Sequence, residues 1–204
     1  MKKSKNSKSN KMLYIGISLI AVSLLIFGGV LFSILKGDNE ETMTPGNFAA
    51  VGQEDSATAC QNLLSDYYSA IMSGDGESLY KLMAPPEYWN YYMENYSKTE
   101  KEIIETYLDA AKNTKATWMA KCGDDAKVSF QIISSVEEPE EFLKNWNDNV
   151  GSLNKTDKLV AEEALNLNVK QTVTGMNGTY QTENSPIVIK INGKWYILDE
   201  GIKN

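Results

Sequence analysis

The stretch SPIVIKINGKWYILD, residues 185–199, decides the fold class of this sequence. Two apolar runs, 187–191 and 194–198, flank the dipeptide Asn192-Gly193. An Asn-Gly pair between two apolar runs is the strongest short-range signal for a β-hairpin, because both residues tolerate the positive φ angles of the tight turn. The C-terminus is therefore predicted to be antiparallel β-structure.

More strands are predicted upstream of this hairpin. Residues 165–173 alternate apolar and polar side chains, as a half-buried strand does, and Asn177-Gly178 predicts a tight turn after them. Residues 116–122 and 127–134 are predicted as two further strands joined by a turn at 123–125.

The segment before these strands has helical spacing of its apolar residues. Gly74 ends the first predicted helix, and a short helix follows at 77–83. Thr99 and Glu102 form a capping-box pattern, so a new helix is predicted after Ser97, although one long kinked helix is the alternative. One more helix is predicted at 138–149. The class is therefore α+β, with helices packed on one face of a curved, mostly antiparallel sheet.

The N-terminus has a different character. Residues 13–35 contain no charge, and as a helix they would span about 34 Å, enough to cross a bilayer. Residues 1–12 hold five lysines and no acid, so the positive-inside rule keeps them in the cytoplasm. We predict a single-pass anchor at the cell membrane, a linker at 36–54 and an extracytoplasmic domain at 55–204. A cleaved signal is the alternative, although signal peptides have shorter apolar regions.

Composition excludes several kinds of chemistry. The chain has 204 residues, no His and a formal net charge of −7, and all of its 20 basic residues are Lys. A His-dependent triad, a His metal site and a bidentate Arg clamp are therefore excluded. Residues 37–204 hold 14 Lys against 27 acids, a balance of −13, so nucleic acid is not an expected partner. The acid clusters at 124–125 and 137–141 lack the spacing of a calcium loop, and we predict no metal or cofactor.

Two stretches resemble nuclear transport factor 2-like domains. Residues 67–87, YYSAIMSGDGESLYKLMAPPE, are similar to the opening helix, Asp-Gly turn and second helix of these domains, and residues 185–199 resemble their final hairpin. The acidic helix at 138–149 resembles secreted bacterial members. The resemblance covers residues 55–204 and implies a cone of helices against a curved sheet, often around a pocket. Members include enzymes, carriers and scaffolds, so the fold alone does not give the function.

Cys60 and Cys122 are candidates for a disulfide, because an even number of cysteines in an oxidising compartment favours pairing. In the resembled fold the first helix lies across the sheet, where two inward-facing cysteines could meet. The alternative is two buried thiols.

Four aromatic residues are candidate pocket-lining residues: Tyr67, Trp89, Tyr92 and Trp118. Their helical spacing favours the alternative, which is core filling. The carboxylates Asp75, Asp109 and Asp199 are candidates for the base of a ketosteroid isomerase-like site, but none has a sequence context that marks a base.

The function predicted from the sequence is a membrane-anchored, non-enzymatic extracytoplasmic domain that binds a protein or small ligand at a bacterial cell envelope. One alternative is an oligomeric scaffold of a conjugation or type IV secretion-like assembly. The other is a small pocket enzyme of the ketosteroid isomerase-like type.

Overall fold

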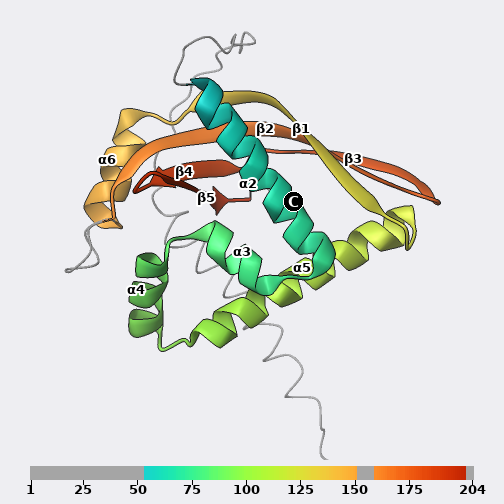
Figure 1. The fold of residues 1–204 in the computed structure, drawn as a ribbon, viewed down its shortest axis with the longest axis horizontal. Helices are drawn as coiled ribbons and strands as arrows, with labels where there is room; N and C mark the ends of the chain where they lie inside the picture. Colours follow the sequence, from blue (N-terminus) through green and yellow to red (C-terminus); the bar gives the residue numbers. More distant parts are fainter. Residues whose placement is uncertain (1–52, 151–158, 201–204) are drawn as a thin grey trace, which may run out of the picture. The chain divides into compact units, whose positions relative to one another are not determined.

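The computed structural model describes residues 53–150 and 159–200, and most of its helices precede its strands (Figure 1). The helices are α2 (Gln53–Ser73), α3 (Gly76–Met83), α4 (Pro86–Tyr96), α5 (Glu100–Cys122) and α6 (Glu140–Asn149). The strands are β1 (Lys127–Glu137), β2 (Ala161–Gly175), β3 (Gly178–Asn184), β4 (Ile187–Ile191) and β5 (Lys194–Asp199). This arrangement confirms the predicted α+β class with a curved antiparallel sheet.

The long strand β2 organises the sheet. It pairs with β1 along one side, while its other side pairs with β4 near its start and with β3 near its end. Strand β5 pairs with β4. The tight turn predicted at Asn192-Gly193 is confirmed, since Ile191 pairs with Lys194 across it. The turn predicted at Asn177-Gly178 is present one residue earlier, at 176–177, since Gly175 pairs with Gly178.

The helix boundaries follow local chemistry. Gly74, with φ of 71°, ends α2 in a conformation that favours glycine. The predicted capping box at the start of α5 is present: the Glu102 amide donates to Thr99 Oγ1 at 3.2 Å, and the Thr99 amide donates to Glu102 Oε2 at 2.9 Å. Ser97 adopts the left-handed conformation between α4 and α5, so the break produces two helices and not one kinked helix.

The strand predicted at residues 116–122 is wrong, because these residues form the last two turns of α5. Trp118 and Cys122 are both buried, as the strand prediction required, but Ala120 between them is exposed. Positions four apart share a face in a helix and also in a strand, whereas positions two apart share a face only in a strand. The exposure of Ala120 therefore distinguishes the two.

Helices α2, α3 and α5 pack against one face of the sheet, called here the inner face. That face carries Leu167, Val169 and Val173 of β2, all 1% exposed or less, in one core cluster with residues of α2 and α5. Gly76 allows α3 to approach α5 closely, because a Cβ there would lie 2.7 Å from the carbonyl oxygen of Ile104. The predicted packing of helices on one face holds for these three helices.

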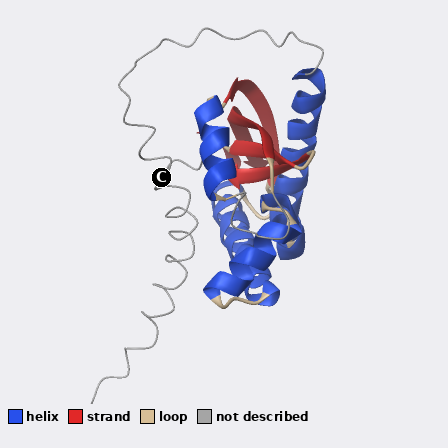
Figure 2. Ribbon diagram, turned by 90° about the vertical axis from the view of Figure 1, so that its left-hand side faces the viewer, coloured by secondary structure: helices blue, strands red, loops and turns tan. Residues whose placement is uncertain are grey.

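The opposite, outer face is also covered in part. Ile189 and Tyr196 pair with each other and are buried, although alternation points them away from the inner-face residues Val188 and Ile197. Helix α6 packs against β2, with Phe142 and Trp146 buried. Figure 2 accordingly shows the sheet between helices on both sides.

The predicted membrane anchor at 13–35 lies outside the described residues, as does the predicted linker at 36–54 except for its last two residues, which begin α2. Within 53–150 and 159–200, no helix is long and apolar enough to span a bilayer.

Candidate functional site

Polar side chains meet on the inner face where two strands end. Strand β3 ends at Asn184, and the last residue of β5 pairs with Ile187 at the start of β4. The carbonyl of Pro186, in the short link between β3 and β4, accepts a hydrogen bond from the Leu167 amide at 2.9 Å. Glu200 directly follows β5, so it lies beside the end of β3.

Tyr67 of α2 connects to this carboxylate. Its hydroxyl donates a hydrogen bond to Glu200, and burial, followed by the negative charge of Glu200, raises the pKa of Tyr67 well above its ordinary value. The side chain is 9% exposed. Tyr67 is therefore a protonated phenol at neutral pH and acts as a donor.

Tyr68, the next residue, connects to a chain of amides. It forms a side-chain hydrogen bond with Asn184, whose Nδ2 donates to Gln171 Oε1 at 2.9 Å. Burial raises the pKa of Tyr68, and the bond with Asn184 partly offsets this effect. The ring packs 5.2 Å from that of Phe130 and 6.3 Å from that of Trp118. Tyr68 thus has an apolar surround and a polar tip.

Gln171 is the last residue of this hydrogen-bonded series, and it has an unused donor. The residue is 4% exposed, and its Nε2 atom has no hydrogen-bond partner in the described part of the chain. Among the described residues, Trp146 Nε1 of α6 is the other buried side-chain nitrogen without a hydrogen-bond partner. A buried donor without a partner costs about 1–3 kcal/mol, so its retention points to an acceptor outside the described residues.

Tyr107 of α5 adds a third phenol. Burial and then the charge of Glu200 raise the pKa of Tyr107 far above its ordinary value. We call the full set the tyrosine–glutamate cluster, and it consists of Tyr67, Tyr68, Tyr107, Gln171, Asn184 and Glu200. Within it, the Tyr67 hydroxyl is bonded to the Glu200 carboxylate, and the Gln171 amide has a donor without a partner in the described residues.

The four predicted pocket residues separate into two groups. Tyr67 and Trp118 belong to the main core. Trp89 forms a second cluster with Tyr80, Ala84 and Ile103, called here the Trp89 cluster, against which Tyr92 packs. The Trp89 Nε1 donates to the Tyr80 carbonyl at 3.0 Å, and the two rings stack at 4.8 Å. Core filling explains these residues, apart from the hydroxyl of Tyr67.

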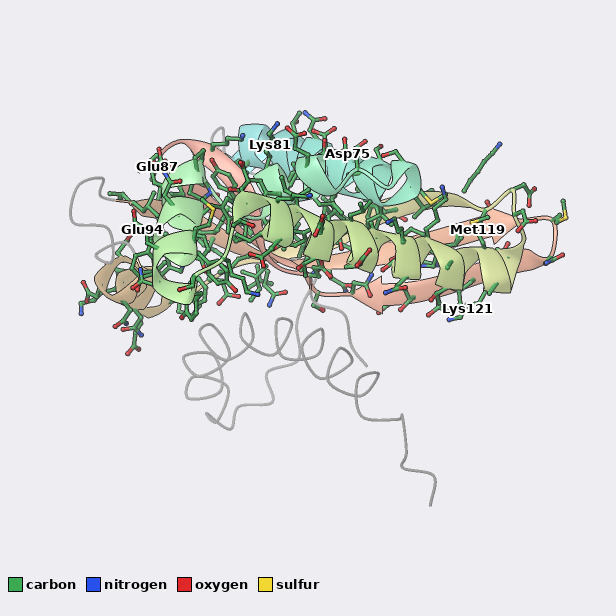
Figure 3. The ribbon with its side chains drawn as sticks, turned by 90° about the horizontal axis from the view of Figure 1, so that it is seen from below. Asp75, Lys81, Glu87, Glu94, Met119 and Lys121 are labelled. Atoms are coloured by element: carbon green, nitrogen blue, oxygen red, sulfur yellow. The ribbon has the colours of Figure 1, made fainter. Side chains whose placement is uncertain are left out.

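Of the three predicted candidate carboxylates, Asp75 has a structural role and Asp109 is exposed. Asp75 caps α3 at the surface (Figure 3), where it accepts from the Ser78 amide at 2.9 Å. The hydrogen bonds from Ser78 lower the pKa of Asp75. Asp109 lies exposed on α5, 3.6 Å from Lys112. Asp199 is the last residue of β5. Sequence reasoning missed Glu200, one residue further on.

The acid clusters hold no metal site within the described residues. Asp125 instead accepts a hydrogen bond from the Met176 amide at 2.8 Å, which joins the end of α5 to the β2–β3 turn.

In place of the predicted disulfide, the structure holds Cys60 and Cys122 as buried free thiols. Burial, and then the nearby charge of Glu163, raises the pKa of Cys60 to about 12. The Cys122 thiol donates to the Val173 carbonyl at 3.4 Å. Glu163 and Val173 are ten positions apart on β2 (173 − 163), which is roughly 30 Å along a strand, whereas a disulfide requires Cα atoms within about 7 Å.

Comparison with known proteins gives no match to a family model, to a curated protein or to a solved structure. The function is therefore argued from the chemistry of the tyrosine–glutamate cluster.

Proposed function

We propose that this chain is a membrane-anchored, non-enzymatic extracytoplasmic binding domain with a nuclear transport factor 2-like cone, and that its site is the tyrosine–glutamate cluster. The observation that carries the proposal is the buried Nε2 of Gln171, which has no partner in the described part of the chain and ends a hydrogen-bonded chain of polar groups. The packing of α2, α3 and α5 on a curved sheet supports the cone. The uncharged residues 13–35 and the five lysines before them support the anchor.

The protonation states favour binding over catalysis. Phenols with raised pKa values remain neutral at physiological pH, so Tyr67, Tyr68 and Tyr107 do not act as bases. The Cys60 thiol is a poor nucleophile for the same reason. The donor of this cluster that has no partner in the described residues, Gln171 Nε2, requires an acceptor.

The surroundings of Gln171 indicate the ligand class. Its free amide donor requires an acceptor such as a carbonyl oxygen, and the neighbouring rings of Tyr68, Phe130 and Trp118 favour an apolar or aromatic body. The carboxylate of Glu200 disfavours an anion. We therefore propose a small neutral ligand with a carbonyl group.

Two observations favour alternative functions. A pocket enzyme of the ketosteroid isomerase-like type is favoured by the position of Glu200 among phenols, since a carboxylate base with phenolic donors can abstract a proton next to a carbonyl. An oligomeric scaffold of a conjugation or type IV secretion-like assembly is favoured by the exposure of β1.

One probe tests binding and catalysis together. Acetophenone carries a ring, a carbonyl and a methyl group with exchangeable hydrogens. Added in heavy water to the full chain in detergent, it should raise the melting temperature and show broadened NMR signals, with no loss of the methyl signal. Gln171→Met should abolish both effects, whereas Tyr96→Phe, on the exposed end of α4, should preserve them.

The outcomes distinguish the proposed binding site from the enzyme alternative. Equal responses from Gln171→Met and the unmodified chain, or no response from either, would refute the proposed site. Exchange of the methyl hydrogens that stops in Glu200→Gln would establish the enzyme instead. The anchor is tested separately by protease added to intact, wall-stripped cells, which should remove the C-terminal domain; complete protection would refute the orientation.

A further inference from the structure

Among the described strands, β1 is the one that exposes large apolar side chains to solvent. Its packing partners are β2 along one edge and α2 across the inner face, and Figure 1 shows it at the border of the sheet. Ile133 and Val136 are each 48% exposed. A long strand edge with exposed apolar side chains is a template for pairing with another strand.

The strands at the other borders of the sheet pack against helices. Helix α5 packs against β3, and Lys121 from α5 (Figure 3) lies 3.6 Å from the centroid of the Tyr180 ring. Helices α2 and α3 pack against β5, in which Trp195 and Ile197 are buried. The exposed residues of β3 are glycine or polar, so within the described strands the exposed apolar side chains are specific to the β1 edge.

A β-bulge produces one of the two exposed apolar side chains of β1. Ile132 pairs with Val169 and Ser134 pairs with Asn168, so Ile133 has no opposite residue on β2. A bulge usually protects an edge from pairing by twisting it. Here it instead presents an isoleucine to solvent in the middle of the strand.

The two ends of β1 carry opposite charges. Lys127 begins the strand and Glu137 ends it, and no ion pair within the described ranges uses either residue. Antiparallel pairing of β1 with itself, centred on Ile132, places Lys127 of each copy opposite Glu137 of the other. The strand is thus complementary to its own reverse in charge.

We propose that β1 is a homodimer interface, in which it pairs antiparallel with β1 of a second copy. Backbone hydrogen bonds extend the sheet across the dimer, the apolar side chains at Ile133 and Val136 leave water, and two ion pairs fix the register. The two-fold symmetry uses the same edge of both copies, so association through β1 stops at the dimer. This inference does not depend on the tyrosine–glutamate cluster.

The test is sedimentation velocity of the full chain in detergent over a range of concentrations. The unmodified chain should dimerise reversibly. Ile133→Lys should raise the dimer dissociation constant by about tenfold or more, because a charge is introduced at the paired edge. Met176→Lys, at a residue 75% exposed in the β2–β3 turn, is the matched control and should leave the dissociation constant unchanged.

Charge reversal tests the register. Lys127→Glu and Glu137→Lys should each weaken the dimer about three- to tenfold, and the double variant should restore it, because the ion pairs re-form with their signs exchanged. A chain that stays monomeric at every concentration overturns the proposal. A dimer that resists Ile133→Lys and both single reversals is held elsewhere, and this result also overturns it.

Discussion

The tyrosine–glutamate cluster and the Trp89 cluster use similar residues differently. In the Trp89 cluster the indole donor is satisfied by the Tyr80 carbonyl, and stacked rings fill the space. In the tyrosine–glutamate cluster the hydroxyls of Tyr67 and Tyr68 bond to a carboxylate and an amide, and a further amide donor has no partner in the described residues. Aromatic content is thus a poor guide to function, whereas the state of the polar atoms separates a packing cluster from a candidate site.

The largest expected effect is a loss of stability, which should be greater when a packed ring is removed than when a buried hydroxyl is removed. Trp89→Ala should lower the free energy of unfolding by about 3–5 kcal/mol, because the side chain is 6% exposed and its removal leaves a cavity. Tyr67→Phe removes one hydroxyl and keeps the ring, so the loss should be about 0.5–1.5 kcal/mol. Denaturant titrations of the full chain in detergent, followed by circular dichroism, compare the two variants. Equal losses would mean that the two clusters do not differ in this way.

Alkaline pH should sharpen the comparison. Burial raises the pKa of Tyr80 to about 12 and that of Tyr67 well above its usual range. Below about pH 10 the phenols are neutral in both states, and above it only the unfolded state ionises, so stability falls by about 1.4 kcal/mol per pH unit for each such tyrosine.

Two phenylalanine variants assign this pH dependence to the clusters. Tyr80→Phe should flatten the fall in stability only up to about pH 12, where the folded phenol also ionises, whereas Tyr67→Phe should flatten it further. Melting temperatures measured from neutral to alkaline pH test this expectation. A Tyr67→Phe curve parallel to that of the unmodified chain would contradict the raised pKa of Tyr67.

The smallest effect concerns how closed the core around the tyrosine–glutamate cluster is. Cys60 and Cys122 belong to that core, and each is 1% exposed. Thiol labelling of the native chain should be slow, and unfolding without reductant should release two reactive thiols per chain. Tyr67→Phe should accelerate native labelling modestly, while Tyr96→Phe should not. Fewer than two thiols after unfolding would show that a disulfide forms in the cell.

Sequence predicted the elements that local chemistry determines. The Asn192-Gly193 hairpin and the Thr99 capping box were correct because a few adjacent residues fix each of them. Residues 116–122 were misassigned because a seven-residue window is too short to distinguish the 3.6-residue period of a helix from the two-residue period of a strand. The helical spacing is clear only over the longer series Ile103, Ala111, Trp118 and Cys122. Strand β3 was missed because its residues are largely polar and exposed.

The candidate site was only partly predictable. Tyr67 was singled out as an aromatic residue near the expected pocket, but its partner Glu200 is 133 positions away (200 − 67), and no local pattern marks that residue. Gln171 occupies an inward position of β2 between Val169 and Val173, where alternation predicts an apolar residue. A polar residue at such a position was the available signal.

Helix α5 joins the two aromatic clusters physically. Its first turns supply Ile103 to the Trp89 cluster, and its last turns supply Trp118 to the main core. The capping box fixes one end, while the other end is held by the Asn177 amide, which donates to the Cys122 carbonyl at 2.8 Å. Because α5 is held at both ends, one cluster cannot separate from it unless the helix opens, and opening the helix breaks the hydrogen bonds that also hold the other cluster. Amide hydrogen exchange along α5 should therefore proceed through one cooperative opening, in which the Trp89 cluster and the candidate site unfold together.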